Sequence, residues 1–287
     1  ETQLLPLAGL RREDCSWANV LRCLAQNTPV LRADLSWSPI ADLQVGDTLV
    51  GFDEWGIPSA KHSQRRQRHL RQSVVTGVRH VRESALRLIF KDQEPVLCSP
   101  QHPWLASRFF SPKSSNNQMR WLPAVQLRPK NRIRRVISPW YPRQDYAEGY
   151  LAAAFDGEGS LYTRLRLRAH CLNFTQRENG MLNYVERLLS QRGFCAGRYL
   201  SSKGTIQLHL QSLHEVIRFL GTMRPKRLTK WNDVWEGRAL PQTGKAEIVA
   251  IETVAPINLV DIETTTATFV AAGLASHNCR WQRSNAL

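Results

Sequence analysis

The sequence predicts two domains: an all-β domain that is interrupted by an inserted α+β domain. Apolar and polar residues alternate as in strands over residues 28–52 and 74–103. Near Trp140 this pattern gives way to runs with helical spacing, and after Gly244 the strand-like pattern returns. A domain tolerates an insertion at an exposed loop when the two ends of the insert lie close together.

The first β part contains a turn signal and a weak repeat. Gly46-Asp47 predicts a turn, and the polar, Arg-rich run 61–71 is interpreted as a loop. Residues 121–136 have the same rhythm as residues 38–51, with small residues, a leucine, a turn and then a strand. We interpret this as an internal repeat, which predicts two related β lobes.

The middle of the chain alternates helical and strand-like runs. Helices are expected at residues 146–155, 181–192 and 213–221, and strands at 164–174 and 204–211. After Gly244, three further strands are expected in AEIVAIETVAP, NLVDIET and TFVAAGL.

Composition narrows the class of protein. Lys and Arg number 39 against 24 Asp and Glu, a net charge of +15, which favours a polyanionic partner over an ordinary basic protein. A hydrophobic content of 42% makes a packed core feasible. No apolar stretch reaches the length of about 18 residues that a membrane span needs, so no membrane association is expected.

The cysteines and the N-terminus indicate a cytoplasmic setting. Six scattered cysteines without a CxxC pair predict reduced thiols, with neither a disulfide framework nor a structural zinc site. The chain starts at Glu1 without a signal-peptide pattern, so we expect it to be a segment of a longer, cytoplasmic protein.

Four segments resemble the conserved blocks of inteins, the self-splicing domains of the Hint fold. The first begins at Cys23 with CLAQNTPVL, and the second is VLCSPQHPWL over residues 96–105. The last two lie in NLVDIETTTATFVAAGLASHNC over residues 258–279. The blocks occur in the order of the family, and the resemblance covers residues 23–140 and about 246–279.

The resemblance implies a reaction at the upstream junction. Cys23 would attack the carbonyl of Arg22 and convert the peptide bond into a thioester, a step that suits a thiolate nucleophile. His102 would protonate the departing nitrogen of Cys23. Ser99, where the family usually has Thr, would hold the carbonyl or the amide by a hydrogen bond.

At the downstream junction, Cys279 would attack the thioester, which transfers the upstream segment onto Cys279. Asp261 resembles the family's acid that activates this cysteine. Asn278 would then cyclise and break its bond to Cys279, assisted by His277. The sequence departs from the family pattern at residues 267–269 (ATF), where some inteins carry a further histidine.

The inserted part resembles the LAGLIDADG homing endonucleases. Residues 151–159 (LAAAFDGEG) match that motif, and the small residues 152–154 would let two such helices approach closely. The resemblance implies that Glu158, with Asp156 beside it, binds Mg2+ for phosphodiester hydrolysis. Because the chain has one convincing motif, cleavage of both DNA strands would require a homodimer through this helix.

The strands and helices that follow fit the same family. Arg164, Arg166 and Arg168 would lie along the major groove of double-stranded DNA, where Arg contacts guanine and phosphate. Lys230 falls where the family's catalytic lysine is expected. A roughly palindromic DNA target follows from the homodimer.

The sequence therefore predicts protein splicing combined with a metal-dependent DNA endonuclease. Three alternatives remain open: Hint-type self-cleavage without ligation, an inactive endonuclease remnant that only binds DNA, and a DNA-binding or RNA-maturase protein with a merely structural β part. The expected parts are an upstream flanking (extein) segment 1–22, the first splicing part 23–140, the endonuclease domain 141–245, the second splicing part 246–278, and a downstream flanking segment 279–287.

Overall fold

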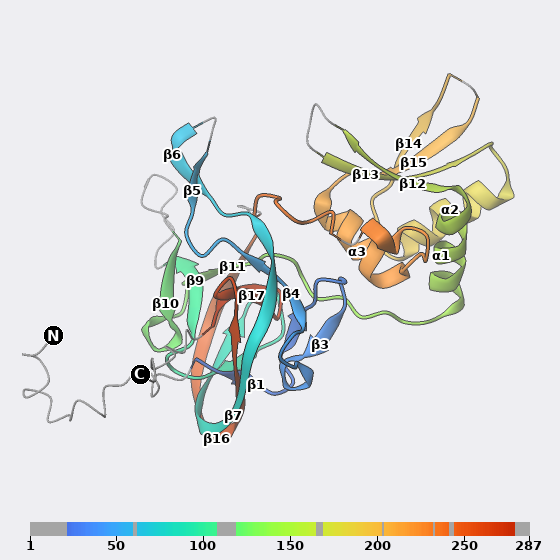
Figure 1. Cartoon of the computed structure of the whole chain (residues 1–287). Helices are drawn as coiled ribbons and strands as arrows, with labels where there is room; N and C mark the ends of the chain where they lie inside the picture. Colours follow the sequence, from blue (N-terminus) through green and yellow to red (C-terminus); the bar gives the residue numbers. More distant parts are fainter. Residues whose placement is uncertain are drawn as a thin grey trace, which may run out of the picture. The chain divides into compact units, whose positions relative to one another are not determined.

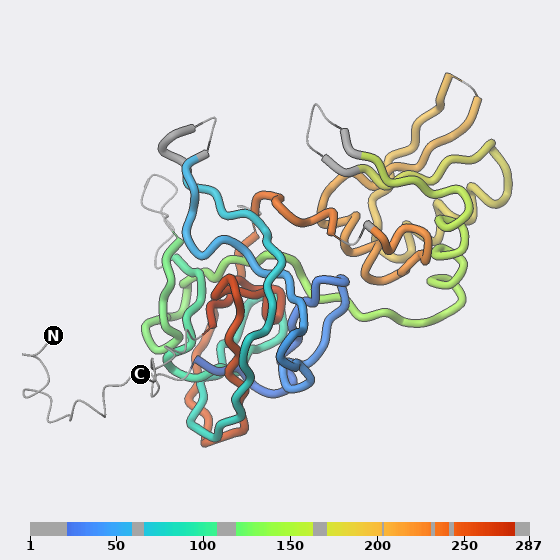
Figure 2. The backbone as a smooth tube through the Cα atoms, viewed as in Figure 1, coloured from blue at the N-terminus to red at the C-terminus, as the bar shows by residue number. Residues whose placement is uncertain are grey.

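The computed structural model describes residues 22–59, 62–107, 119–164, 169–202, 204–231, 233–240 and 244–278. The chain forms two compact units (Figure 1). The β unit consists of Glu1–Leu31, Ser38–Ser138 and Ala239–Leu287, and the α+β unit of Arg32–Trp37 and Pro139–Arg238. Figure 2 traces the chain, in which residues 139–238, coloured green to orange, form most of the α+β unit.

The β unit is built on one large sheet with the order β3-β2-β17-β18-β9-β11-β16-β1-β8-β7-β4, and β10 pairs with β9. Two strands run through much of it, β7 (Leu70–Phe90) and β16 (Lys245–Thr264), which pair antiparallel. The others are β1 (Leu24–Ala25), β2 (Pro29–Leu31), β3 (Trp37–Pro39), β4 (Thr48–Phe52), β8 (Val96–Cys98), β9 (Pro103–Ser107), β10 (Arg120–Pro123), β11 (Arg132–Arg134), β17 (Thr268–Ala271) and β18 (Leu274–His277), with 3-10 helices η3 (Ile40–Asp42) and η4 (Ala124–Gln126).

The short strand β1 lies in the interior of this sheet. It pairs with β16 through Leu24 and Val260, and with β8 through Leu24 and Cys98. Trp104 and Phe269 are buried in the same core. The residue that precedes this strand, Cys23, is therefore fully buried rather than exposed at a chain end.

The predicted internal repeat is confirmed by matching hydrogen bonds in two turns. The turn before β4 has Gly46 in a left-handed conformation. In the same turn, the backbone amide of Gln44 donates to the Asp47 side chain at 2.9 Å. The turn before β11 has Lys130 in that conformation, and Arg128 donates to the Asn131 side chain at 3.0 Å. Asp and Asn side chains commonly close turns in this way.

The repeat extends to the loops that precede each 3-10 helix. The carbonyl oxygen of Thr28 accepts from the Ile40 amide at 2.9 Å. In the second copy, the carbonyl oxygen of His102 accepts from the Ala124 amide at 2.9 Å. Thr28 and His102 thus occupy equivalent places in two loops of the same main-chain shape.

The interpretation of residues 61–71 as a loop was wrong. His62–Gln67 forms β6, which pairs with β5 (Ile57–Ser59), and β7 already begins at Leu70. Among the described residues, β5 and β6 form a sheet of two strands only. The backbone of such a ribbon can pair without a buried face, so the sequence shows no apolar alternation.

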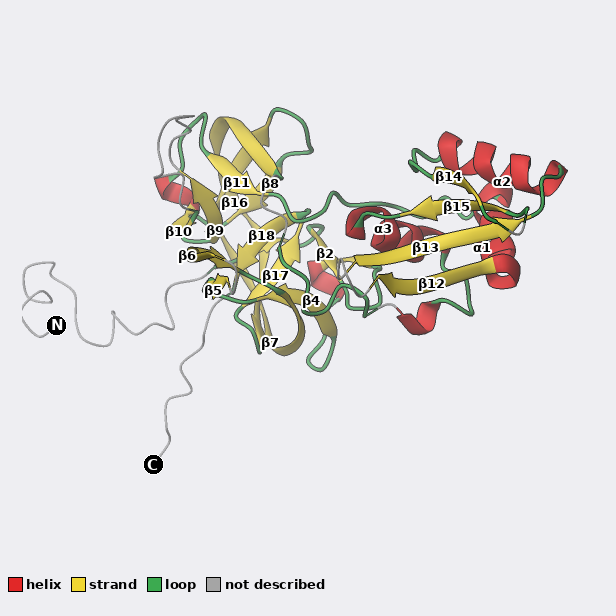
Figure 3. Ribbon diagram, turned by 90° about the horizontal axis from the view of Figure 1, so that it is seen from above, coloured by secondary structure: helices red, strands yellow, loops and turns green. Residues whose placement is uncertain are grey.

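The α+β unit is an antiparallel sheet with three helices on one face (Figure 1 and Figure 3). The expected helices are present, with ends shifted by up to three residues. In chain order the elements are α1 (Tyr146–Glu158), β12 (Gly159–Arg164), β13 (Ala169–Gln176), α2 (Gly180–Gln191), β14 (Gly197–Leu200), β15 (Ile206–Leu210), α3 (Leu213–Met223) and the 3-10 helix η5 (Thr229–Trp231), and the sheet order is β12-β13-β15-β14.

Aromatic packing joins the helices of this unit to its sheet. Phe155 of α1 contacts Phe174 of β13 and Phe219 of α3, with ring centroids 5.5 and 4.4 Å apart. The indole of Trp235 donates to the carbonyl of Ala33, which attaches residues 32–37 to this unit. No helix in the described part of the chain is long and apolar enough to span a membrane.

Candidate functional site

The upstream junction, the peptide bond between Arg22 and Cys23, is held at both of its polar atoms. The amide of Cys23 donates to Ser99 Oγ at 2.9 Å, and the amide of Ser99 donates back to the Cys23 carbonyl oxygen at 2.9 Å. The carbonyl oxygen of Arg22 lies 2.8 Å from His102 Nδ1. The sequence predicted that His102 acts on the nitrogen of this peptide bond. In the structure the His102 imidazole contacts the carbonyl oxygen of Arg22, and Ser99 Oγ accepts from the amide nitrogen of Cys23.

The partners of His102 define its tautomer. A carbonyl oxygen only accepts hydrogen bonds, so Nδ1 carries the proton. The other nitrogen, Nε2, lies 2.9 Å from Ser276 Oγ and accepts from that hydroxyl. Burial lowers the pKa of His102 to about 3; the hydrogen bond to Arg22 opposes this shift, and the charges of His277 and Arg22 add to it. His102 is therefore a neutral donor to the Arg22 carbonyl at neutral pH.

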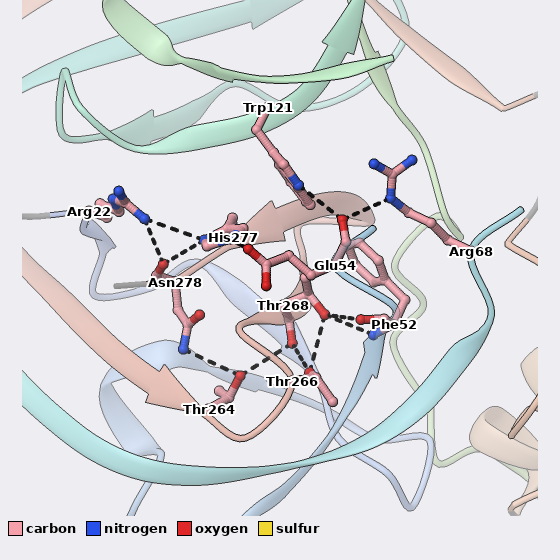
Figure 4. A network of polar contacts seen from close by, with 10 residues as sticks. All are labelled: Arg22, Phe52, Glu54, Arg68, Trp121, Thr264, Thr266, Thr268, His277 and Asn278. Atoms are coloured by element: carbon pink, nitrogen blue, oxygen red, sulfur yellow. Dashed lines mark hydrogen bonds and ion pairs between the residues drawn. The ribbon is translucent and has the colours of Figure 1, made fainter. Parts of the chain in front are cut away.

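The downstream junction begins at Asn278, whose carbonyl oxygen has two donors (Figure 4). His277 Nδ1 lies 2.6 Å from this oxygen, and Arg22 Nη1 donates to it at 3.2 Å. His277 and Asn278 are both buried. The carbonyl of the bond that would break is thus polarised in the same manner as the one at the upstream junction.

The side chain of Asn278 is fixed by residues of the β16–β17 turn. In one orientation Nδ2 donates to Thr264 Oγ1 at 3.3 Å (Figure 4). With the amide turned over, Nδ2 donates to the Ala267 carbonyl at 2.6 Å and Oδ1 accepts from the Thr264 amide. We favour the second orientation because it satisfies both polar atoms of a buried side chain.

A residue that sequence reasoning missed completes this junction. Glu54, in the turn after β4, has its Oε1 at 3.0 Å from His277 Nε2. The ring of Trp121 lies edge-on to the imidazole, with centroids 4.9 Å apart. The departure from the family pattern at residues 267–269 indicates that a histidine of the family is absent there, but it does not point to Glu54 as a partner of His277.

Asp261 is fully buried in β16. It follows Val260, which pairs with Leu24, and Leu24 in turn follows Cys23. Burial, together with the charge of Asp261, raises the pKa of Glu83 on the paired strand β7. Cys279 lies outside the described residues, so the contact expected between it and Asp261 stays a prediction.

In the α+β unit, the two acids of the predicted metal site have different roles. Asp156 accepts backbone hydrogen bonds from Lys226 and Arg227, at 2.9 and 2.7 Å, so its carboxylate is used to hold the segment after α3. Glu158 is exposed at the last residue of α1. No group of three or more His, Cys, Asp or Glu that could hold a metal ion occurs within the described ranges.

The remaining predicted DNA-contacting residues are only partly described. Lys230 is exposed in η5. The backbone of Arg164 ends β12, but its side chain, together with Arg166 and Arg168, lies outside the described residues. Their proposed contacts with DNA stay predictions.

No model of a known protein family matches the chain, and no curated protein matches it. Among solved structures, the DnaB intein from Synechocystis sp. PCC 6803 is 11% identical with a TM-score of 0.39, covering 90% of this chain and 99% of the intein. The gp41-1 intein is 12% identical with a TM-score of 0.36, covering 89% and 98%. The DnaX mini intein from Spirulina platensis is 13% identical with a TM-score of 0.33, covering 89% and 99%. These structural neighbours of the chain are inteins.

Proposed function

We propose that the β unit carries out autocatalytic protein splicing, which excises residues 23–278 and joins the flanking segments. One observation carries the proposal: Arg22 contacts both junctions. Its carbonyl oxygen accepts from His102, and its guanidinium donates to the carbonyl oxygen of Asn278. The two bonds that splicing must break therefore lie within reach of a single residue, and each has a polarised carbonyl.

In the first step, Cys23 Sγ attacks the carbonyl carbon of Arg22, and the bond from that carbon to the Cys23 nitrogen breaks. The proton of the thiol ends on the released amine, so the peptide bond is converted into an isomeric thioester. The Nδ1 proton of His102 stabilises the charge that develops on the oxygen. Ser99 Oγ, which accepts from the scissile amide, is suited to pass a proton to the leaving nitrogen.

In the later steps, Cys279 Sγ attacks the thioester carbon and releases the thiol of Cys23. We retain Asp261 as the acid that activates Cys279. Nδ2 of Asn278 then attacks its own carbonyl carbon, and the bond to the Cys279 nitrogen breaks, with the proton from Nδ2 ending on that amine. A shift from sulfur to nitrogen at Cys279 restores a normal peptide bond.

Mass spectrometry of the expressed chain tests splicing. We expect a free piece of residues 23–278 and a ligated product that joins Arg22 to Cys279. Cys23→Ala should abolish ligation but permit cleavage after Asn278, and Asn278→Ala should block that cleavage. A wild-type chain that keeps its full mass would contradict the proposal and favour a structural role for the β unit.

Cys279→Ala separates splicing from self-cleavage without ligation. Under splicing, this variant loses the ligated product because the second nucleophile is absent. If the wild-type chain yields only cleaved pieces, and Cys279→Ala leaves that pattern unchanged, the Hint-type self-cleavage alternative is favoured instead.

We further propose that the α+β unit is an endonuclease of the LAGLIDADG type that acts as a homodimer. Two features support this: the element order α1-β12-β13-α2-β14-β15-α3, and an exposed acid, Glu158, at the end of α1. Gly149, Ala153 and Gly157 are exposed along α1 at a spacing of four residues, which suits close packing against a second copy.

Glu158 would hold Mg2+ together with its counterpart from a second copy, and the ion would supply Lewis-acid stabilisation of the leaving oxygen. Asp156 does not fit as a ligand because its carboxylate already accepts two backbone amides. On the face of the sheet opposite the helices, Gln207 is partly exposed, whereas Asn173 and His209 are buried. The exposed part of this face would contact double-stranded DNA.

Plasmid cleavage in the presence of Mg2+ tests this second proposal. Glu158→Gln should abolish cutting while DNA binding persists, because only the metal-binding charge is lost. Cutting by the variant at the wild-type rate would exclude Glu158 as the metal ligand. DNA binding without cutting by the wild-type chain would favour the inactive-remnant alternative.

A further inference from the structure

Glu54 contacts the imidazole that faces the downstream junction. Its Oε1 lies 3.0 Å from His277 Nε2, and the side chains of Glu54 and His277 are only 13% and 8% exposed. The opposite nitrogen of the ring, Nδ1, lies 2.6 Å from the carbonyl oxygen of Asn278. The ring therefore bridges a carboxyl group from the turn after β4 and the bond that is to be cleaved (Figure 4).

This arrangement places a proton on Nδ1. The carbonyl oxygen of Asn278 can only accept, so the nitrogen that faces it must donate. If Glu54 is ionised, Nε2 donates to it and the ring is a cation; if Glu54 is protonated, Nε2 accepts from it. In both states the carboxyl group keeps Nδ1 protonated and the ring oriented, as in other imidazoles that a second group orients.

Glu54 is itself held in place by its backbone. Its carbonyl oxygen accepts from the indole of Trp121 at 3.1 Å and from Arg68 Nε at 3.2 Å. The same indole packs edge-on against His277. Three segments distant in the sequence, the β4–β5 turn, β10 and β18, therefore meet around this one imidazole (Figure 4).

Among the described residues, the other carboxylate close to Glu54 is Asp53, which is paired with His69 and Arg71. The remaining charged groups beside the imidazole are cationic. Arg22 Nη1 lies 3.5 Å from Nδ1 of His277, and Arg68 is close enough to Glu54 for their charges to interact. His102, which also senses the charge of His277, is neutral because of its burial. Among these groups, Glu54 is the one that can oppose the positive charges around the ring.

We propose that Glu54 is a positioning residue for cleavage of the bond between Asn278 and Cys279. It holds His277 so that Nδ1 donates to the Asn278 carbonyl oxygen while Nδ2 of Asn278 forms its new bond to the carbonyl carbon. The negative charge that develops on that oxygen is thereby stabilised before the amine of Cys279 leaves. This inference rests on the proposed splicing and names a group that supports its last cleavage.

The test isolates the downstream reaction in the Cys23→Ala chain, where cyclisation of Asn278 is the remaining step. Glu54→Ala should slow this cleavage by about 10- to 100-fold, the range for loss of a group that orients a functional imidazole. Glu54→Gln should be less affected, because its amide can donate to Nε2 and keep the proton on Nδ1. A Gln variant as slow as the Ala variant would overturn the proposal.

A second readout excludes a general loss of folding. In the Asn278→Ala chain, cleavage at Cys23 induced by an added thiol should change by less than about twofold with Glu54→Ala, because that junction depends on Ser99 and His102. Nitrogen NMR of His277 should report a protonated Nδ1 in the parent chain and a mixture of tautomers in Glu54→Ala. Equal slowing at both junctions, or an unchanged tautomer, would contradict the proposal.

The matched control is Glu252→Ala, which removes a 52%-exposed carboxylate on the same unit that pairs with Arg87. It should leave both cleavage rates unchanged. If the Cys23→Ala chain with Glu54 intact does not cleave after Asn278 at all, splicing itself is contradicted. If it cleaves and Glu54→Ala cleaves as fast, only the role of Glu54 is refuted.

Discussion

Replacing His102 by Ala should stop thioester formation at the upstream junction almost completely. The imidazole donates to the Arg22 carbonyl oxygen over 2.8 Å from a fully buried position. Removing one such donor from a developing oxyanion costs about 2.7–4 kcal/mol of transition-state stabilisation, a rate loss of about 100- to 1000-fold. Because His102 is neutral, the loss should be of the same size at pH 6 and pH 8.

The assay uses the Asn278→Ala chain, in which the upstream step is isolated. An added thiol intercepts the thioester, and mass spectrometry follows the release of the segment that ends at Arg22. Ser276→Ala is the companion variant: it removes the donor to Nε2 but leaves Nδ1 on the carbonyl, so we expect a loss of about tenfold.

Two results would refute this reasoning. A His102→Ala chain that cleaves within about fivefold of its parent would mean that the donor contributes little. A loss that appears only below pH 6.5 would mean that His102 acts as a protonated acid, contrary to the pKa of about 3 that its burial produces. Thermal unfolding of each variant provides the check that the fold is retained.

Three further outcomes are expected. Because the pKa of His102 falls from about 6.5 to about 3 on folding, protonation favours the unfolded chain. The free energy of unfolding should therefore be full above pH 6.5 and fall below it, by up to about 1.4 kcal/mol per pH unit. Urea titrations at a series of pH values should show a smaller dependence of this free energy on pH in His102→Gln. Gly51→Ala places a Cβ 2.5 Å from Thr266 Oγ1 and should destabilise the β unit by about 1–3 kcal/mol in the same titrations; an unchanged midpoint would contradict the packing. Arg22→Ala removes the second donor to the Asn278 carbonyl and should slow cleavage in the Cys23→Ala chain by about tenfold, while Arg22→Lys should restore part of that rate.

Local patterns predicted most of the elements. Helices α2 and α3 of the α+β unit have strong apolar periodicity, whereas α1 is a run of Leu and Ala. The starts of all three are fixed by side chains that accept from the first turn, Asp145, Asn179 and Ser212. The repeated turn was visible because both copies share a rhythm of small residues, a leucine, a turn and a strand. In each copy the turn places a residue with a left-handed backbone just before Asp or Asn.

Features that depend on distant pairing could not be predicted. Residues 32–37 join the α+β unit through contacts such as that of Trp235 with Ala33, and no local pattern marks them. The partner of Glu54 lies 223 positions away in the sequence. The resemblance to the second intein block placed a hydroxyl and an imidazole at residues 99 and 102, but only the path of the chain decides which atom of the peptide bond each one contacts.

The loop that carries His102 is repeated elsewhere in the β unit, where Thr28 occupies the equivalent position. Main-chain hydrogen bonds fix the shape of both loops. The shape of the loop is thus independent of the reactive side chain, since one copy maintains it without an imidazole. Substitutions at position 102 should therefore yield a correctly folded chain that is blocked at the upstream junction. Combined with Asn278→Ala, which blocks the downstream cleavage, such a variant is the natural starting material for capturing the uncleaved chain, with both flanks still attached, for structural study.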